Sequence, residues 1–139
     1  MISARYMNTV VMRLDIGDEI CSCIKKACEK HDVKLASVTG IGVTKSAVIG
    51  LYDLEKQEFI SNEFNGIMEI ASLTGNVTTM DGEIYIHLHA LVCDNQGKSF
   101  GGHLKEGIIG ATGEIFINVA DGSVGRVKQK ETGLNILDI

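Results

Sequence analysis

The stretch that decides the fold is Ile84-Tyr85-Ile86-His87-Leu88-His89-Ala90-Leu91-Val92-Cys93. Successive side chains of a β-strand point to opposite faces, so the stretch separates into two sets of residues. One face is aliphatic and carries Ile84, Ile86, Leu88, Ala90 and Val92. The other face carries Tyr85, His87, His89, Leu91 and Cys93. We therefore predict a strand with one face in a hydrophobic core and the other available for function.

The sequence around this strand predicts more strands and a single helix. Asp81-Gly82 is a hairpin signal directly before it. The helix is expected at about 18–31, where apolar residues recur at helical spacing from Ile20 to Ala27. A short helical turn is expected around His103–Gly107. The predicted strands are Arg5–Leu14, Lys34–Gly40, Thr44–Tyr52, Gln57–Glu63, Gly66–Leu73, Glu83–Cys93, Ile109–Val119 and Leu134–Leu137. The fold class is thus α+β, a mostly antiparallel sheet of about seven strands with one main helix.

Length and composition indicate one globular domain over residues 1–139. The chain is 45% hydrophobic and 22% charged, with a net charge of −5. Nucleic-acid binding is not expected, because the chain has no large basic stripe; Arg126, Lys128 and Lys130 are interpreted as a solvated strand face or turn. No apolar run is long enough to cross a membrane. Four cysteines without a Cys-x-x-Cys motif are interpreted as reduced thiols of a cytoplasmic protein.

Three of the four histidines fall in two short motifs. His87 and His89 project from the same strand face, about 7 Å apart along the strand. His103 follows Gly101-Gly102, and paired glycines allow a supporting loop to bring a third ligand close. Three neutral imidazoles with an open fourth position are typical of a zinc site that accepts a ligand. The alternative is a pair of hydrogen-bonded strand histidines and an unrelated loop histidine, while His31 belongs to the helix end.

Glu69 is a carboxylate that could act together with these histidines. Glu69 shares its predicted strand face with apolar neighbours, so it needs a partner or a shifted pKa. It is a candidate fourth ligand, hydrogen-bond acceptor for an imidazole N–H group, or general base. The alternative is a solvent-facing carboxylate or one paired with Arg13, and Glu114 raises the same question more weakly.

The order of motifs resembles the plants-and-prokaryotes-conserved (PPC) domain from about Met7 to Leu134. The segments that carry the resemblance are Arg13-Leu14, Gly40-Ile41-Gly42, Gly50-Leu51-Tyr52-Asp53, Glu69-Ile70, Leu73-Thr74-Gly75-Asn76, Asp81-Gly82, His87-Leu88-His89-Ala90, Gly101-Gly102-His103-Leu104 and Glu114. The resemblance implies a compact α+β homotrimer with its histidine clusters near subunit boundaries.

The resemblance also implies a function. In plant members the domain follows AT-hook segments and recruits other nuclear proteins, and prokaryotic members are often labelled DNA-binding proteins. An AT-hook needs a proline-containing core, and the 139 residues contain no proline. We therefore expect a stand-alone, trimeric binding module that is not an enzyme and that has a small-molecule or protein partner. The label of the family associates such a module with transcription.

The His-x-His motif and the later histidine are also similar to the zinc site of acetolactate decarboxylase. This similarity implies His87, His89 and His103 as metal ligands and zinc as the metal, with Glu69 as an acid–base candidate. The alternative function is a zinc-dependent lyase or hydrolase that acts on a small keto acid or carboxylate. Tyr85, Asn76 and Arg13 are the polar residues nominated to orient such a substrate.

Overall fold

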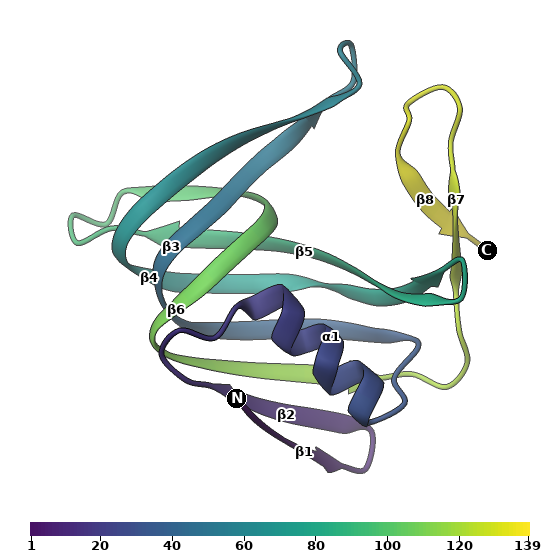
Figure 1. Ribbon diagram of the computed structural model, residues 1–139, viewed down its shortest axis with the longest axis horizontal. Coiled ribbons are helices and arrows are strands. Elements are labelled where there is room, and N and C mark those ends of the chain that lie inside the picture. Colours follow the sequence, from purple (N-terminus) through teal and green to yellow (C-terminus); the bar gives the residue numbers. More distant parts are fainter.

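The computed structural model describes all 139 residues and contains one helix and eight strands (Figure 1). The elements are β1 (Ile2–Tyr6), β2 (Thr9–Leu14), α1 (Ile20–Lys30), β3 (Ala36–Asp53), β4 (Glu58–Met80), β5 (Glu83–Cys93), β6 (Ser99–Val119), β7 (Gly125–Lys128) and β8 (Asn135–Asp138). Every strand pair is antiparallel. The predicted α+β fold is confirmed, with eight strands instead of about seven.

The main sheet has the order β1-β2-β6-β3-β4-β5, and β5 also pairs with β6. Strands β6, β3, β4 and β5 therefore form a closed ring of pairings, which requires long strands that bend. β3, β4 and β6 have 18, 23 and 21 residues. Register shifts between Gly40 and Gly42, between Thr44 and Ser46, and between Ile70 and Ser72 mark the bends.

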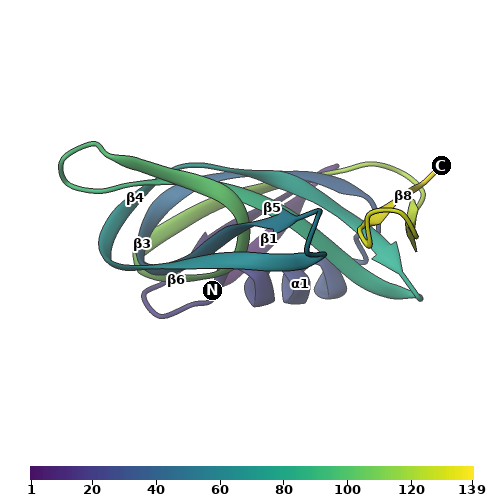
Figure 2. The same ribbon diagram turned by 90° about the horizontal axis from the view of Figure 1, so that it is seen from above.

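Helix α1 covers one face of the sheet (Figure 2). Its N-cap is Glu19, whose carboxylate accepts hydrogen bonds from the backbone N–H groups of Cys21 and Ser22 at 2.9 and 2.6 Å. Ile24, fully buried, is part of a 24-residue core that joins the helix to the inner side of the sheet. At 11 residues, this helix is neither long nor apolar enough to cross a membrane.

The core face predicted for β5 is confirmed. Leu88, Ala90 and Val92 are buried, and Ile84 and Ile86 pack against the same core. The Asp81-Gly82 hairpin is also confirmed, since both residues have positive φ between β4 and β5.

Several predicted boundaries are wrong, for physical reasons. Arg5–Leu14 is interrupted by a turn at Met7, whose φ is 52°, so it contributes to β1 and β2. Lys34–Gly40 and Thr44–Tyr52 are one strand, because glycine-rich bends continue the pairing where the sequence suggested a break. The same holds for Gln57–Glu63 and Gly66–Leu73 in β4.

At the end of the chain, β8 (Asn135–Asp138) corresponds to the predicted strand Leu134–Leu137. β7 was not predicted, and it pairs with β8 in a hairpin that lies beside the end of β4 and the start of β5 (Figure 1). The helical turn expected at His103–Gly107 is absent, because this segment belongs to β6.

Candidate metal and ligand site

Three histidines converge on the face of the sheet opposite α1. The ligand atoms of His87, His89 and His103 all lie within 4.8 Å of one another. The ring centroids are 5.2 Å apart for His87 and His89, 5.1 Å for His87 and His103, and 5.7 Å for His89 and His103. Nitrogen ligands of a tetrahedral ion lie roughly 3.4 Å apart, as follows from a metal–nitrogen distance of about 2.0–2.1 Å. Small side-chain rotations therefore suffice for all three rings to contact one cation.

The register of the β5–β6 hairpin explains why the two motifs meet. His89 and His103 lie directly opposite each other across this hairpin. Directly opposed residues of antiparallel strands have neighbouring side chains on the same face. His87 lies two residues earlier on the same face of β5, so a single hairpin supplies all three rings.

The predicted glycine support is present in β6 and not in a loop. A Cβ on Gly102 would lie 2.6 Å from the carbonyl oxygen of Gly50, which is tighter than real Cβ contacts. Gly50 is also the β3 partner of His103. The missing side chain thus lets β3 and β6 approach beside the third histidine. Gly101 is less tightly enclosed, since a Cβ there would lie 3.1 Å from Cδ1 of Leu91 and 3.2 Å from the carbonyl oxygen of Ala90.

The environment of His87 and His103 favours the neutral form of these two imidazoles. Burial, followed by the neighbouring His103, His89 and Arg126, lowers the pKa of His87 to about 4. Burial and the neighbouring His89 lower the pKa of His103. A neutral imidazole has a lone pair for a cation, whereas an imidazolium has none. His87 and His103 therefore have lone pairs available for a cation at neutral pH.

Sequence reasoning missed Arg126, which is half-buried and lies beside the histidines. Its Nη2 donates to Asn76 Oδ1 at 2.8 Å, and its Nε donates to Thr78 Oγ1 at 2.8 Å. Its Nη1 donates to the carbonyl of Asn135 at 2.7 Å, and the guanidinium lies 4.5 Å from the ring centroid of Tyr85. The earlier interpretation as a solvated strand face is wrong for Arg126, although Lys128 and Lys130 are exposed. The alternating basic residues do not distinguish Arg126 from Lys128 and Lys130, because the side chains that accept from it, Thr78 and Asn76, lie 48 and 50 positions away in the sequence.

The three histidines and Arg126 line one open cavity of about 750 Å³. Asn76 and Tyr85, both nominated from the sequence, also line it, and Asn76 lies opposite His87. The C-terminal hairpin and the β3–β4 turn region supply the remaining walls. Arg126 is the sole charged residue among the lining residues, which are Gly50, Leu51, Tyr52, Phe59, Asn76, Tyr85, His87, His89, Gly102, His103, Arg126, Gly133, Leu134, Asn135, Ile136 and Leu137.

The other nominated residues lie elsewhere. Glu69 is exposed and pairs with Cys93, at the end of β5 beyond the histidines. Its neighbours Ile67 and Ala71 are also exposed, so its strand face is a solvent-facing one. Arg13 binds Asp15, with Nε donating at 3.1 Å, and does not reach Glu69. His31 caps the helix end, as expected, and its Nε2 lies 3.1 Å from Ser3 Oγ.

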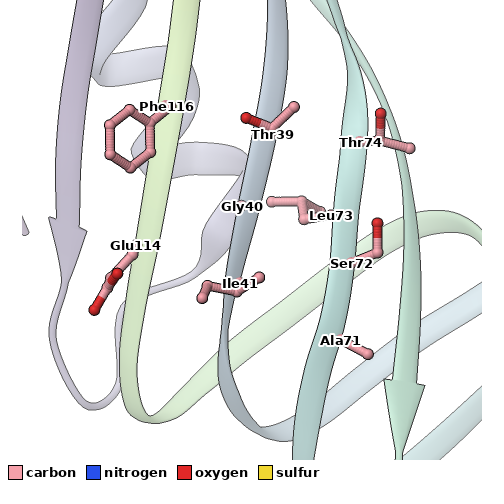
Figure 3. Close-up of a pocket in the computed structure, with 9 residues that line it drawn as sticks. All are labelled: Thr39, Gly40, Ile41, Ala71, Ser72, Leu73, Thr74, Glu114 and Phe116. Atoms are coloured by element: carbon pink, nitrogen blue, oxygen red, sulfur yellow. The ribbon is translucent and has the colours of Figure 1, made fainter.

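Glu114 lines a different hollow, shown in Figure 3. This shallow depression of about 320 Å³ lies over β3, β4 and β6, on the sheet face that α1 leaves uncovered. Exposed Ile41 and Phe116 contribute to its rim, with 57% and 44% of their surface accessible. It holds no histidine, so Glu114 lies apart from the three-histidine cluster.

Fold and site together define a small α+β domain with a three-histidine cluster on an open sheet face. The sequence matches the Plants and Prokaryotes Conserved (PCC) domain over residues 1–121. The chain belongs to this family, which is the PPC domain whose motifs it resembles.

Solved structures with this fold come from archaea and bacteria. A PPC protein of Pyrococcus horikoshii is 33% identical, covers 99% of this chain and 94% of its own, and has a TM-score of 0.88. A metal-containing protein of Archaeoglobus fulgidus is 31% identical over 94% of this chain and 93% of its own, with a TM-score of 0.87. A "putative dna binding protein" of Bacteroides thetaiotaomicron is 25% identical over 99% and 96% of the two chains, with a TM-score of 0.95.

One curated protein shows a partial match. The bifunctional protein GlmU of Synechococcus sp. is 29% identical to this chain over 108 residues. The match covers 76% of this chain and 16% of that protein. It therefore says nothing of whether this chain has the activity of GlmU.

Proposed function

We propose that this protein is a ligand-binding module of the PPC family whose His87, His89 and His103 hold one divalent cation. The observation that carries the proposal is the convergence of the three ligand atoms within 4.8 Å. No ring nitrogen of these residues is taken by a hydrogen bond to the protein, whereas His31 uses its Nε2 in this way. A related protein of Archaeoglobus fulgidus is described as metal-containing, which supports the same assignment.

The donor set favours zinc among the divalent cations. Calcium and magnesium prefer oxygen ligands, and no carboxylate lines the cavity. Imidazole nitrogen suits zinc, and three imidazoles leave a further coordination position for an external ligand. A zinc ion bound there would supply Lewis acidity toward an oxygen-containing ligand.

We further propose that the module is a homotrimer, as the family resemblance implies. The uncovered face of the main sheet supports self-association, because it exposes Ile41, Ile67 and Phe116 to solvent. Sedimentation equilibrium at micromolar concentration tests this proposal. A mass of about 45 kDa, three times the 15.0 kDa chain, is expected for a closed trimer. A mass near that of one chain would contradict it.

Binding of duplex DNA is not part of the proposed function. Two similar structures carry a DNA-binding description, which leaves nucleic-acid binding open. The net charge of −5 argues against contacts with many phosphates. Of the basic residues near the C-terminus, Arg126 is engaged inside the cavity. Specific binding to a duplex that weakens steeply with salt would overturn this view.

The cavity gives the lyase or hydrolase alternative some support. It places Arg126, Tyr85 and Asn76 near the histidines, and these polar groups can orient a small substrate. The acid–base role expected of Glu69 has no geometric basis, because Glu69 lies outside the cavity. With no carboxylate to move a proton, we favour binding over catalysis, with a small-molecule or protein partner.

Elemental analysis of protein purified without an affinity tag tests the metal site. We expect about one zinc ion per chain in the wild type and in Glu69→Ala, and a large loss of metal in His89→Ala. His89 is exposed, so its loss should leave the fold intact, and circular dichroism checks this. Wild-type protein that binds no zinc after dialysis against the ion would refute the proposal. Equal metal loss in Glu69→Ala would refute the assigned ligands.

A further inference from the structure

We infer that the Arg126 end of the cavity is a carboxylate-binding subsite, so that the module takes a small organic carboxylate. Arg126 presents a half-buried guanidinium with no acidic partner, and none of the protein's ion pairs includes it. Charged groups withdrawn from water normally have a partner of opposite charge. Here the partner must come from solution.

The hydrogen bonds of Arg126 fix its orientation and leave donors free. A guanidinium has five N–H donors, and protein oxygens accept from Nε, Nη1 and Nη2 once each. One N–H on each of Nη1 and Nη2 therefore remains. Two N–H groups on the two terminal nitrogens suit the two oxygens of a carboxylate. The ring of Tyr85 covers one side of the guanidinium and limits its movement.

The net positive charge of the cavity also favours a negatively charged ligand. Arg126 contributes +1, and the cavity wall contains neither Asp nor Glu. This part of the inference is independent of any metal. The other part rests on the proposed function. A divalent cation held by three neutral imidazoles adds two further positive charges and no compensating negative one. A ligand with negatively charged oxygen at both ends would satisfy both halves of the cavity.

Size also favours a small molecule. The cavity of about 750 Å³ is open, and its walls include apolar residues such as Phe59, Leu134 and Ile136. The polar groups are concentrated at two places, the histidine cluster and Arg126. Tyr85 lies two residues before His87 on the same strand face, so the two places are about 7 Å apart along β5. A carbon chain of a few atoms with a carboxylate at each end spans this separation.

Succinate is a suitable probe, and succinamide is its neutral counterpart of the same length. Isothermal titration calorimetry is carried out on the full chain, once metal-free and once loaded with zinc. The variants are Arg126→Gln and the matched control Lys128→Gln, which removes the same charge from an exposed position two residues along β7. We expect Arg126→Gln to weaken succinate binding about tenfold or more, and Lys128→Gln to change it less than twofold.

Arg126→Gln also removes hydrogen bonds between β7 and β4, so a loss of binding could reflect a change in structure. A second variant distinguishes this effect from the loss of the charge. Asn76→Asp keeps the oxygen that accepts from Nη2 and adds a negative charge beside the guanidinium. We expect this variant to lose succinate binding while its thermal stability stays at or above that of the wild type. Retained succinate binding in Asn76→Asp would overturn the inference.

Each remaining outcome decides between the claims. Equal effects of Arg126→Gln and Lys128→Gln, or binding of succinamide as tight as that of succinate, would overturn the carboxylate subsite. Binding of inorganic phosphate without binding of succinate would overturn the organic ligand class. Zinc binding without succinate binding would support the proposed cation site and refute the carboxylate subsite. Succinate binding that depends on Arg126, in a protein that takes up no zinc, would support the carboxylate subsite and refute the proposed cation site.

Discussion

Replacing Gly102 with alanine should test whether the close approach of the β3 and β6 backbones supports the histidine site, because the substitution leaves all three histidines in place. A Cβ at this position would lie 2.6 Å from the carbonyl oxygen of Gly50 and 3.3 Å from Cγ2 of Ile49. A carbon and a carbonyl oxygen normally approach to about 3.3 Å. The backbone of β6 must therefore move away from β3 by about 0.7 Å, at the residue next to His103. Since the obstacle is backbone and not a flexible side chain, it cannot rotate away.

The expected loss of stability follows from this displacement. Overpacking of a well-packed site costs about 1–3 kcal/mol. The φ of 152° at Gly102, unusual for a residue with a Cβ, adds strain of about 1 kcal/mol. We expect Gly102→Ala to lower the free energy of unfolding by about 2–4 kcal/mol. With a urea m-value of about 2 kcal/mol/M, the midpoint falls by about 1–2 M.

Gly101→Ala is the matched control. Its Cβ would meet Cδ1 of Leu91 at 3.1 Å, a side-chain atom that can rotate, and the carbonyl oxygen of Ala90 at 3.2 Å, which is close to the normal approach of about 3.3 Å. The residue also has no positive φ. Both substitutions reduce the entropy of the unfolded chain equally, so this effect cancels in the comparison. We expect Gly101→Ala to remain within about 1 kcal/mol of the wild type.

The assay is urea unfolding of the metal-free variants, because a bound ion would stabilise the folded state and hide the difference. A second measurement is zinc affinity, which should fall in Gly102→Ala and stay unchanged in Gly101→Ala. Equal midpoints and equal zinc affinities for the two variants would refute the close approach of β3 and β6 as the support of the site.

Two further predictions concern the thiols and the helix. Burial, followed by Glu19, raises the pKa of Cys21 to about 12, and burial, followed by Glu29, raises the pKa of Cys28 to about 12. Burial also raises the pKa of Cys23, which leaves the partly exposed Cys93. At pH 8 the thiol reagent DTNB should therefore label one cysteine quickly, and Cys93→Ser should remove this fast phase; a fast phase that survives the substitution would contradict the assignment. Glu19→Ala should lower the free energy of unfolding by about 1–2 kcal/mol, since its carboxylate caps α1 and also accepts from the N–H of Gly107 at 3.3 Å. Glu29→Ala is the control, expected to change stability by less than about 0.5 kcal/mol, and equal losses in the two variants would contradict the cap.

Local pattern was sufficient for β5 and for the histidine pair. Alternation placed Leu88 in the core and His87 and His89 on the opposite face, because side-chain direction in a strand depends only on the parity of the position. The helix was found for a similar reason, since its apolar spacing repeats over three turns. These features depend on residues close together in the chain.

The remaining features depend on long-range pairing. Glycines and bulges in β3 and β4 look like chain breaks in the sequence, yet neighbouring strands continue the hydrogen bonding through them. The apolar neighbours of Glu69 left a site role and a solvent-facing position both open, and the sheet exposes that face to solvent. Arg126 joins the site through contacts with Asn76 and Thr78. No local pattern contains such contacts.

The two ends of the cavity come from different parts of the chain. The three histidines lie within residues 1–121, which match the PPC family, while Arg126 lies beyond them on the β7–β8 hairpin. The three imidazoles proposed to hold a cation all come from the β5–β6 hairpin, whose register brings His89 and His103 together. The charge proposed to select a ligand needs the C-terminal hairpin to dock against β4 and Tyr85. The proposed metal site and the proposed carboxylate subsite therefore draw on separate parts of the chain. A change in the C-terminal hairpin alone should alter the ligand without altering the metal.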